Sequence, residues 1–593
     1  KDPDVFFSGG NNGSWLERTN RRTGESREVG PYPLIYSGQP SKEIPERIQW
    51  TFPIVFSPVD PNILYTATQH VWKSTNQGNS WTRLGGDLTR HDPKTMDVSG
   101  GPITHDMNGP EVYATVFAIG PGKTDVNIIW AGSDDGLINV TRDAGKTWTN
   151  VTPKDMPDFG RVSIIDASKF DPAVAYVAVK RPLLDDFAPY IFRTKDFGRT
   201  WTKIVTGITP NDYVHAVRED PTRKGLLYAG TQHGVYVSFD DGDHWQSLSL
   251  NLPEIPVADL IVERNDLAIA THGRSFYILD NIGPLRQSGP AMGTGDAVLL
   301  KPNNAIRSYN QATVQYILRK PAQSLTLEFI DAKGTVVRSL VGGAAAAAPA
   351  GRAGAAGAAG AGGGGGGRGG APVAAPLSMS PGMNSATWNL RYPNATSFPG
   401  MILWGGNVTG PMAAPGTYTV KLTVDGKVLT QPLVVERHPL YSATDAELVE
   451  QFNFLIQVRD KTSEANNAVI QIRSIKSQIA DRIGKASGDV KLKDTADRLV
   501  ANLSTVEGEI YQVKNQSGQD PLNFPIKINN WLAGLLSMVG NGDGKPTTEA
   551  PKIFADLSAK LKVQTDNLAE VFSKDFIAFN AELKRLGLDQ IVK

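Results

Sequence analysis

The sequence predicts a mainly β protein with a helical C-terminal part, and three observations support this. An eight-residue pattern, Ser/Thr-x-Asp-x-Gly-x-x-Trp, occurs four times between residues 74 and 245, with Asn76 in place of the acid in the first copy. Short apolar segments separated by turn residues surround each copy. After residue 439, apolar residues instead recur three and four positions apart, which is typical of amphipathic helices. A pattern that repeats in this way makes a repeat fold the first hypothesis.

Each position of the repeated pattern has a predicted role in a hairpin turn. The acid or amide should accept hydrogen bonds from backbone N–H groups two or three residues ahead. The glycine supplies a positive φ, and the tryptophan offers an apolar surface to bury against a neighbouring sheet. Turn geometry thus explains these residues, so we exclude them from catalysis. They are Asn76, Gly78 and Trp81; Asp143, Gly145 and Trp148; Asp196, Gly198 and Trp201; and Asp240, Gly242 and Trp245.

Three short apolar segments precede each copy of the pattern, such as SIIDASKF, AYVAVK and YIFRT before TKDFGRTW, and a fourth strand begins at its tryptophan. Four strands per unit with a turn between each pair predict a β-propeller blade. Residues 1–285 would hold one partial blade, four units with the pattern, and a last unit from Val257 to Asp280. We therefore expect an N-terminal propeller segment, covalent or on a second chain, to complete the ring.

The pattern and the strand order resemble the Asp-box (BNR-repeat) β-propellers, a family that includes sialidases, xyloglucan-cleaving glycosidases and the sortilin ectodomain. Segments such as GLLYAGTQHGVYVSFDDG, ATHGRSFYILDN and PGTYTVKLTVDG are similar to a bacterial secreted group labelled glycosyl hydrolase, BNR repeat, or sortilin-like. In that group an immunoglobulin-like module and a helical tail follow the propeller. The resemblance implies a secreted, periplasmic or cell-surface protein.

Residues 286–438 predict a single antiparallel β-sandwich, immunoglobulin-like or fibronectin-like, because alternating strands occur in two halves. A hairpin turn is expected at Lys333 and Gly334. Between the halves, residues 342–376 are almost entirely Ala, Gly and Pro. Low complexity of this kind predicts a flexible insertion.

Residues 439–593 predict a helical domain. A helix of about forty residues should begin at a capping box formed by Thr444 and Glu447. Further helices are expected at about 490–514, 525–539, 547–572 and 573–586. If the tail mediates homo-oligomerisation, the apolar faces of 445–483 and 547–586 should be buried between chains.

Composition excludes several function classes. Lys plus Arg number 60 and Asp plus Glu number 60, so no net field favours nucleic acid. The chain has no cysteine, which excludes disulfides, thiolate nucleophiles and zinc–cysteine sites. The sequence contains no phosphate-binding, metalloprotease or calcium-loop motif, so no cofactor and no metal is predicted.

Glycosidases need two carboxyl groups flanking the scissile bond, one protonated and one ionised. The glycine-rich connection MDVSGGPITHDMNGPEVY places Asp106 before an inner strand, where it could pair with Asp134 or Asp135 as catalytic acids. The alternative is that these are solvated loop acids.

Three further clusters are candidates for ligand binding, each with a structural alternative. An insertion on a rigid blade suits recognition, although exposed charge runs are often energetically minor. In the strand YVHAVRED, alternation places His215 and Glu219 on one face and Arg218 on the other. The candidate residues are Asp97, His105, Lys180, Arg181, Asp185, Asp186, His215, Glu219, His272 and Arg274.

Two main functions remain open. The first is a secreted, sortilin-like binding or scaffold protein that recognises a peptide, glycan or protein partner; the second is a glycoside hydrolase acting on extracellular polysaccharide. A structural role in an extracellular assembly is a third. Binding is favoured because no acid pair stands out from the carboxylates that turn geometry explains.

Overall fold

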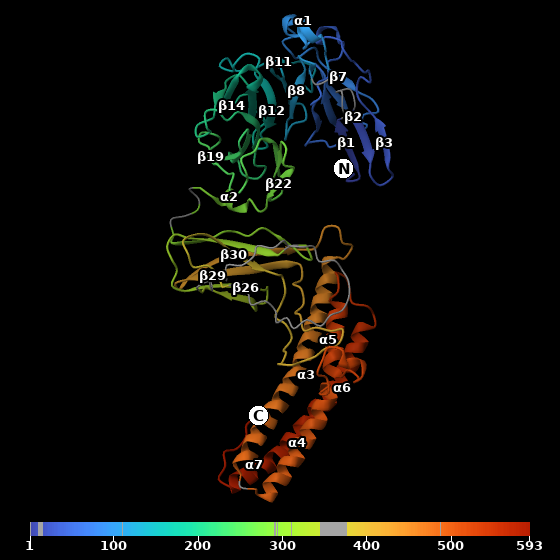
Figure 1. The fold of residues 1–593 in the computed structure, drawn as a ribbon, viewed down its shortest axis with the longest axis vertical. Helices are drawn as coiled ribbons and strands as arrows, with labels where there is room; N and C mark the ends of the chain where they lie inside the picture. Colours follow the sequence, from blue (N-terminus) through green and yellow to red (C-terminus); the bar gives the residue numbers. More distant parts are fainter. Residues whose placement is uncertain are drawn as a thin grey trace. The chain divides into compact units, whose positions relative to one another are not determined.

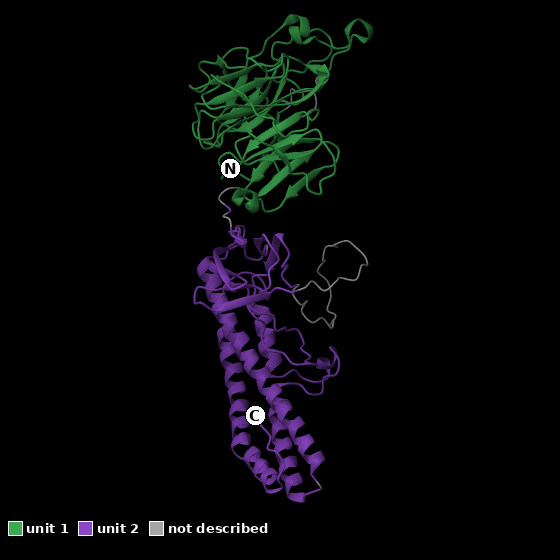
Figure 2. Cartoon of the chain, turned by 90° about the vertical axis from the view of Figure 1, so that its left-hand side faces the viewer, with its two compact units in different colours: residues 1–291 green, residues 292–593 purple. Residues whose placement is uncertain are grey.

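The computed structural model describes residues 2–9, 16–108, 111–289, 292, 295–309, 311–343, 376–486 and 488–593. The chain divides into two compact units, Lys1–Ala291 and Met292–Lys593 (Figure 2). No helix among the described residues is both long and apolar enough to span a bilayer.

The first unit consists of antiparallel sheets that follow one another along the chain (Figure 1). In each sheet the strands pair in chain order. The first sheet holds β1 (Val5–Gly9), β2 (Leu16–Asn20) and β3 (Glu25–Glu28), and the second β4 (Ile54–Phe56), β5 (Leu64–Ala67), β6 (Val71–Ser74) and β7 (Thr82–Leu84). The third holds β8 (Val116–Pro121), β9 (Ile129–Ser133), β10 (Ile138–Thr141) and β11 (Thr149–Asn150), and the fourth β12 (Arg161–Ala167), β13 (Ala175–Arg181), β14 (Asp186–Thr194) and β15 (Thr202–Lys203). The fifth holds β16 (Val214–Glu219), β17 (Leu227–Thr231), β18 (Val235–Ser238) and β19 (Gln246–Ser247), and the sixth β20 (Val257–Glu263), β21 (Asp266–Thr271) and β22 (Phe276–Leu279). Two short helices, α1 (Gly101–Thr104) and α2 (Gly283–Gln287), lie outside the sheets.

Consecutive sheets pack face to face through their first strands. Strand β12 packs on β8 and β9, β16 on β12 and β13, and β20 on β16 and β17. The second strands β9 and β17 are buried along their whole length because a sheet covers each of their faces. Repeated four-stranded antiparallel sheets stacked in this way have the architecture of propeller blades.

The repeated turns have the same geometry in all four copies. In the second copy, Asp143 Oδ1 accepts the Thr147 N–H at 2.9 Å, and Thr141 Oγ1 accepts the Gly145 N–H at 3.0 Å. The turn is therefore wider than the two- or three-residue span expected from the sequence. The reason is that two consecutive residues, Ala144 and Gly145, have left-handed φ values of 60° and 88°.

The tryptophan that ends each pattern is bonded to the preceding sheet. The indole N–H of Trp148 donates to the Leu84 carbonyl at 3.1 Å, at the end of β7. Leu84 also leaves no room for a side chain at Gly145, because an added Cβ would lie 2.7 Å from Leu84 Cβ. Each turn is therefore hydrogen-bonded to the preceding sheet. In the other three copies the indole N–H donates to a backbone carbonyl: Trp81 to Val29, Trp201 to Val151 and Trp245 to Ile204.

The second unit begins with two sheets that share one core. Strands β23 (Ala297–Leu299), β25 (Ala312–Leu318) and β28 (Gly382–Trp388) form one antiparallel sheet. The other has the order β24 (Ala305–Ile306), β30 (Lys427–Glu436), β29 (Gly416–Val424), β26 (Leu325–Ile330) and β27 (Val336–Val341), in which only β24 and β30 pair in parallel. Phe329 and Trp388 are fully buried in the shared core. Residues 344–375 of the predicted insertion lie outside the described residues.

The rest of the second unit is helical, as predicted. It contains α3 (Asp445–Lys485), α4 (Val490–Ile510), α5 (Ile528–Val539), α6 (Ala550–Ser573) and α7 (Asp575–Arg585). The predicted capping box is confirmed, because Thr444 and Glu447 each bond the other's backbone N–H. The apolar faces of the helices pack on one another in a single core within the chain. This internal packing counts against association of the tail through those faces.

Candidate functional site

A cavity of about 340 Å³ opens in the first unit where β12 begins and where β9 and β13 end. It combines charged, polar, aromatic and aliphatic side chains from five segments of the chain. The lining residues are Thr95, Tyr113, Asp134, Phe159, Arg161, Lys180, Arg181, Pro182, Leu183 and Leu184. It thus includes three of the residues that the sequence singled out, namely Asp134, Lys180 and Arg181.

Asp134 follows the last residue of β9 and is almost fully buried. Its Oδ1 accepts the Thr115 backbone N–H and its Oδ2 accepts the Thr115 hydroxyl, both at 2.8 Å. Burial raises the pKa of Asp134 to about 7, the bonds from Thr115 oppose the rise, and the adjacent Asp135 adds to it. Near neutral pH, the carboxyl group of Asp134 is therefore partly protonated and partly ionised.

Arg161 and Lys180 are directly opposite each other in the antiparallel pair of β12 and β13. The Arg161 guanidinium lies 4.9 Å from the centre of the Phe117 ring. Within the described part of the chain, neither cation is paired with a carboxylate. Burial and, to a smaller extent, the positive charge of Arg161 together lower the pKa of Lys180 to about 8. Two like charges placed opposite one another in a sheet repel each other, so the arrangement favours a bound anion.

His215 holds the Lys180 ammonium group from the next sheet. Lys180 Nζ lies 3.0 Å from His215 Nδ1, and His215 Nε2 lies 3.2 Å from Gln232 Oε1. Burial lowers the pKa of His215 to about 4, and the Lys180 charge contributes. The ring is therefore neutral at pH 7, with Nδ1 accepting from Lys180 and the Nε2–H donating to Gln232.

Arg181 and the segment after it form the rim of the cavity. Arg181 Nη1 donates to Asp186 Oδ2 at 2.8 Å, while its buried Nε has no hydrogen-bond partner. Leu183 and Leu184, in the short 3₁₀ turn Pro182–Leu184, are 81% and 52% exposed. The rim therefore offers an apolar surface beside the basic groups.

The structure does not bring the proposed acid pair into this cavity. Asp106 is exposed in its own loop, where its carboxylate accepts from the Thr104 hydroxyl, and that bond lowers its pKa. Asp135 is turned away from the cavity: its Oδ1 accepts from Ser133 Oγ at 2.6 Å and its Oδ2 from the Arg90 N–H at 2.9 Å. Of the candidate acids, only Asp134 is part of the described lining.

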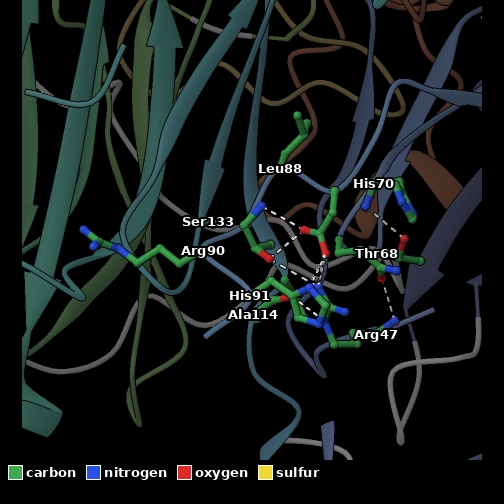
Figure 3. A network of polar contacts seen from close by, with 12 residues as sticks. Arg47, Thr68, His70, Leu88, Arg90, His91, Ala114 and Ser133 are labelled. Carbon is green, nitrogen blue, oxygen red and sulfur yellow. Dashed lines mark hydrogen bonds and ion pairs between the residues drawn. The ribbon is translucent and has the colours of Figure 1, made fainter. Parts of the chain in front are cut away.

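Asp135 is instead bonded to Arg90, in the segment between β7 and β8. Figure 3 shows the polar network around that segment, in which Arg47 lies beside Ala114. Arg47 is buried there, with its Nε donating to the Ala114 carbonyl at 2.8 Å and its Nη2 to Asp87 at 2.7 Å. Beside it, His70 Nδ1 and the Thr68 hydroxyl both contact Glu46 Oε2. This network explains the position of Asp135 without a ligand.

The remaining candidates lie apart from the cavity. Asp97 is exposed and forms an ion pair with Lys42 at 3.1 Å. His105 is exposed and ends α1 in a left-handed conformation. Asp185 is exposed in a turn with a φ of 59°.

His215 and Glu219 both contact the preceding sheet, but at opposite ends of β16. Glu219 accepts from Ser168 Oγ at 2.6 Å and lines a different cavity. A β-bulge between Val214 and Ala216 interrupts the simple alternation. His272 and Arg274 are exposed in the turn after β21, not in a strand.

Sequence reasoning missed Arg161 and Tyr113. A signal for Arg161 was available, because the hairpin formed by RVSIIDA and AYVAVKR pairs Arg161 with Lys180. Tyr113 precedes β8 by three residues and is brought to the cavity by contacts that are distant in sequence, so the sequence held no signal for it.

No protein-family model matches the chain, and no curated protein matches it. Among solved structures, the chain is similar to an ancestral GH74 enzyme, with 15% identity over 51% of this chain and 39% of the other and a TM-score of 0.30. The GH74 xyloglucanase from Xanthomonas campestris is 14% identical over 53% of this chain and 49% of its own, with a TM-score of 0.32. A structure of YCF48 bound to D1 peptide is 14% identical, with 53% and 85% covered and a TM-score of 0.30.

The chain spans between about two fifths and half of the length of these two GH74 structures. At such TM-scores these structures do not identify which residues of this chain form a site. The description of the chain as mainly β, with blade-like antiparallel sheets followed by a helical region, therefore rests on its own strand pairing and packing.

Proposed function

We propose that the chain is an Asp-box propeller protein whose cavity at Arg161 and Lys180 binds a peptide or glycan through an anionic group. The observation that carries this proposal is the register of β12 and β13, which sets these two cations opposite each other with no carboxylate on either. A guanidinium and an ammonium at this spacing would both donate to a carboxylate. The exposed side chains of Leu183 and Leu184 would pack against an apolar part of the same ligand.

The charge of the cavity supports an anionic ligand at neutral pH. Asp134 carries only part of a negative charge near pH 7 because its pKa is raised to about 7. Arg181 forms an ion pair with Asp186, whereas Arg161 and Lys180 form no ion pair with a described side chain. The carboxyl group of Asp134, which is close enough to feel the charge of Arg161, offsets that charge only in part near pH 7. The net potential that a ligand meets is therefore positive.

Binding can be tested by calorimetry with four probes at pH 6.5: a peptide with a free C-terminal carboxylate, its C-terminal amide, a uronic-acid oligosaccharide, and a neutral xyloglucan oligosaccharide. We expect one of the two carboxylate probes to bind, and Lys180→Met to weaken that binding at least tenfold. The matched control is Lys224→Met, which changes an exposed lysine that does not line the cavity. Equal binding of the carboxylate and neutral probes, or an unchanged affinity in Lys180→Met, would contradict the proposal.

Glycoside hydrolysis is the second candidate, and the raised pKa of Asp134 is the observation in its favour. A carboxyl group that is protonated near pH 7 can serve as a general acid. The mechanism also needs a second carboxylate, roughly 5 to 9.5 Å away, and the described lining of the cavity contributes only Asp134. Hydrolysis of xyloglucan that is lost in Asp134→Asn would establish this function in place of simple binding.

A further inference from the structure

The sixth sheet, β20–β22, has one face that no other described sheet covers. Leu260 and Ile269 are buried against the fifth sheet in a common core. On the other face, the strand register aligns Ile261 with Ala268 and Ile278, and these two isoleucines are 58% and 62% exposed. Phe276 is on the same face and is 76% exposed.

The inner sheets show how deeply a second strand is buried when a sheet covers each of its faces. Strands β9 and β17, the second strands of the third and fifth sheets, are buried at every position because a sheet packs on each side. Strand β21 occupies the same place in the sixth sheet, yet only Leu267 and Ile269 are buried in it. An apolar face left open in this way marks an interaction surface.

A repeated detail of the sheet-to-sheet contact is also present on this face. The first strands β8, β12, β16 and β20 each contain a β-bulge, and a small residue of the second strand pairs with the residue just after it. These small residues are Gly132, Ala178, Gly230 and Ala270.

In the interior of the stack, the small residue makes room for a valine of the following sheet. A Cβ added at Gly132 would overlap the Val162 side chain, and one added at Gly230 would lie 2.8 Å from Val257 Cγ1. Val162 and Val257 are the residues just before the bulges of β12 and β20. Ala270 therefore stands where the sixth sheet would receive the equivalent residue of a seventh.

A cavity of about 650 Å³ lies beside this face. Its lining joins Ile261 and Phe276 of the sixth sheet to Pro58, which follows β4, and to Lys123, which follows β8. The open face therefore borders a space that also reaches the ends of the second and third sheets.

We infer that the face of β20–β22 around Ala270 packs against the first strand of a further antiparallel sheet, with a β-branched residue seated on Ala270. The occupant is a sheet of the same type, separate from the described sheets of this chain, because only such a sheet repeats the existing interface. The inference goes beyond the proposed ligand site, which lies at the opposite ends of the first strands.

The test is photo-crosslinking of the protein produced in its own cells, with a benzoylphenylalanine at Phe276. We expect the cross-linked peptide to come from an alternating apolar strand adjacent to a Ser/Thr-x-Asp-x-Gly-x-x-Trp pattern. The control position is Tyr277, the next residue, whose side chain points to the other face. It should not give the same product.

A second variant tests whether the further sheet contacts Ala270. Ala270→Leu should reduce the yield of the Phe276 cross-link at least tenfold, while the circular dichroism spectrum and Tm stay unchanged because the added atoms project into the open face. Cross-links to residues 292–593 of the same chain, to Phe276 of a second copy, to a helical peptide or to lipid would each overturn the inference. So would the absence of any product at Phe276.

Discussion

Arg307 and Asp543 form a buried ion pair that joins the β-sheet part of the second unit to its helical part. Arg307 Nε donates to Asp543 Oδ1 at 2.9 Å, and both side chains are 3% exposed. The same guanidinium donates to the Met412 and Ala413 carbonyls and to Gln451 Oε1 on α3. One arginine next to β24 therefore contacts three separate segments.

Removal of the arginine should destabilise the second unit strongly. Arg307→Met leaves Asp543 buried with its charge unpaired and with only the Ser308 hydroxyl as donor, and it removes a donor from two buried carbonyls. A broken buried pair costs about 3–5 kcal/mol. Chemical unfolding of the second unit, followed by α-helical circular dichroism, should show this loss. The matched control is Lys552→Met, which removes an exposed ion pair with Glu549 and should leave the unfolding midpoint unchanged. Equal midpoints for the wild type and Arg307→Met would disprove the structural role of the pair.

The glycine of each repeated turn should tolerate no side chain. Gly145→Ala combines a left-handed φ of 88° with a Cβ placed 2.7 Å from Leu84 Cβ. Backbone strain and overpacking together predict a loss of about 3 kcal/mol in the first unit.

A matched control separates the two causes. Gly273 has a φ of 100°, but nothing lies within 4 Å of an added Cβ, so Gly273→Ala should cost only the backbone strain, about 1–2 kcal/mol. Thermal unfolding of the first unit measures both. If the two variants lose the same stability, the contact with Leu84 contributes nothing.

Much of this architecture was readable from the sequence because its signals are local. The repeated pattern located four turns, and the change of period after residue 439 located the helices to within a few residues. The helix predicted at 525–539, for example, is Ile528–Val539. The four-residue reach of Asp143 was not readable, since a left-handed Ala144 is not what alanine favours.

The site was less readable because its contacts are distant in sequence. Asp134 and Asp135 looked alike in the segment SDDG, yet one accepts from Thr115 and lines the cavity while the other accepts from Arg90. His215 contacts Lys180 of the preceding sheet, and nothing in the strand YVHAVRED identifies that partner. Only the packing of the sheets decides these partners.

His215 should make the first unit less stable in mild acid. Its pKa is lowered from 6.5 to about 4, so between these pH values the unfolded chain binds a proton that the folded chain does not. Stability attributable to this group is present above pH 6.5 and is lost as the pH falls, by about 2 kcal/mol at pH 4.5.

Urea unfolding at pH 6.5 and pH 4.5 tests this sign. His215→Gln should lose less stability between the two pH values than the wild type, because glutamine does not titrate. Asp134 titrates in both proteins, so its contribution cancels in the comparison. An identical loss in the two proteins would show that His215 is protonated in the folded state.

Anion binding at the cavity should weaken as the pH rises through about 7 to 8. Asp134, with a pKa of about 7, gains its negative charge in this range, and Lys180, with a pKa of about 8, loses its positive charge. Both changes reduce the attraction for a carboxylate, so the affinity of the carboxylate probe should fall at least tenfold between pH 6 and pH 9. Calorimetry across this range with Asp134→Asn separates the two groups, since the variant keeps only the later step near pH 8. An affinity of the carboxylate probe that stays constant or rises with pH would show that Arg161 and Lys180 are not its partners.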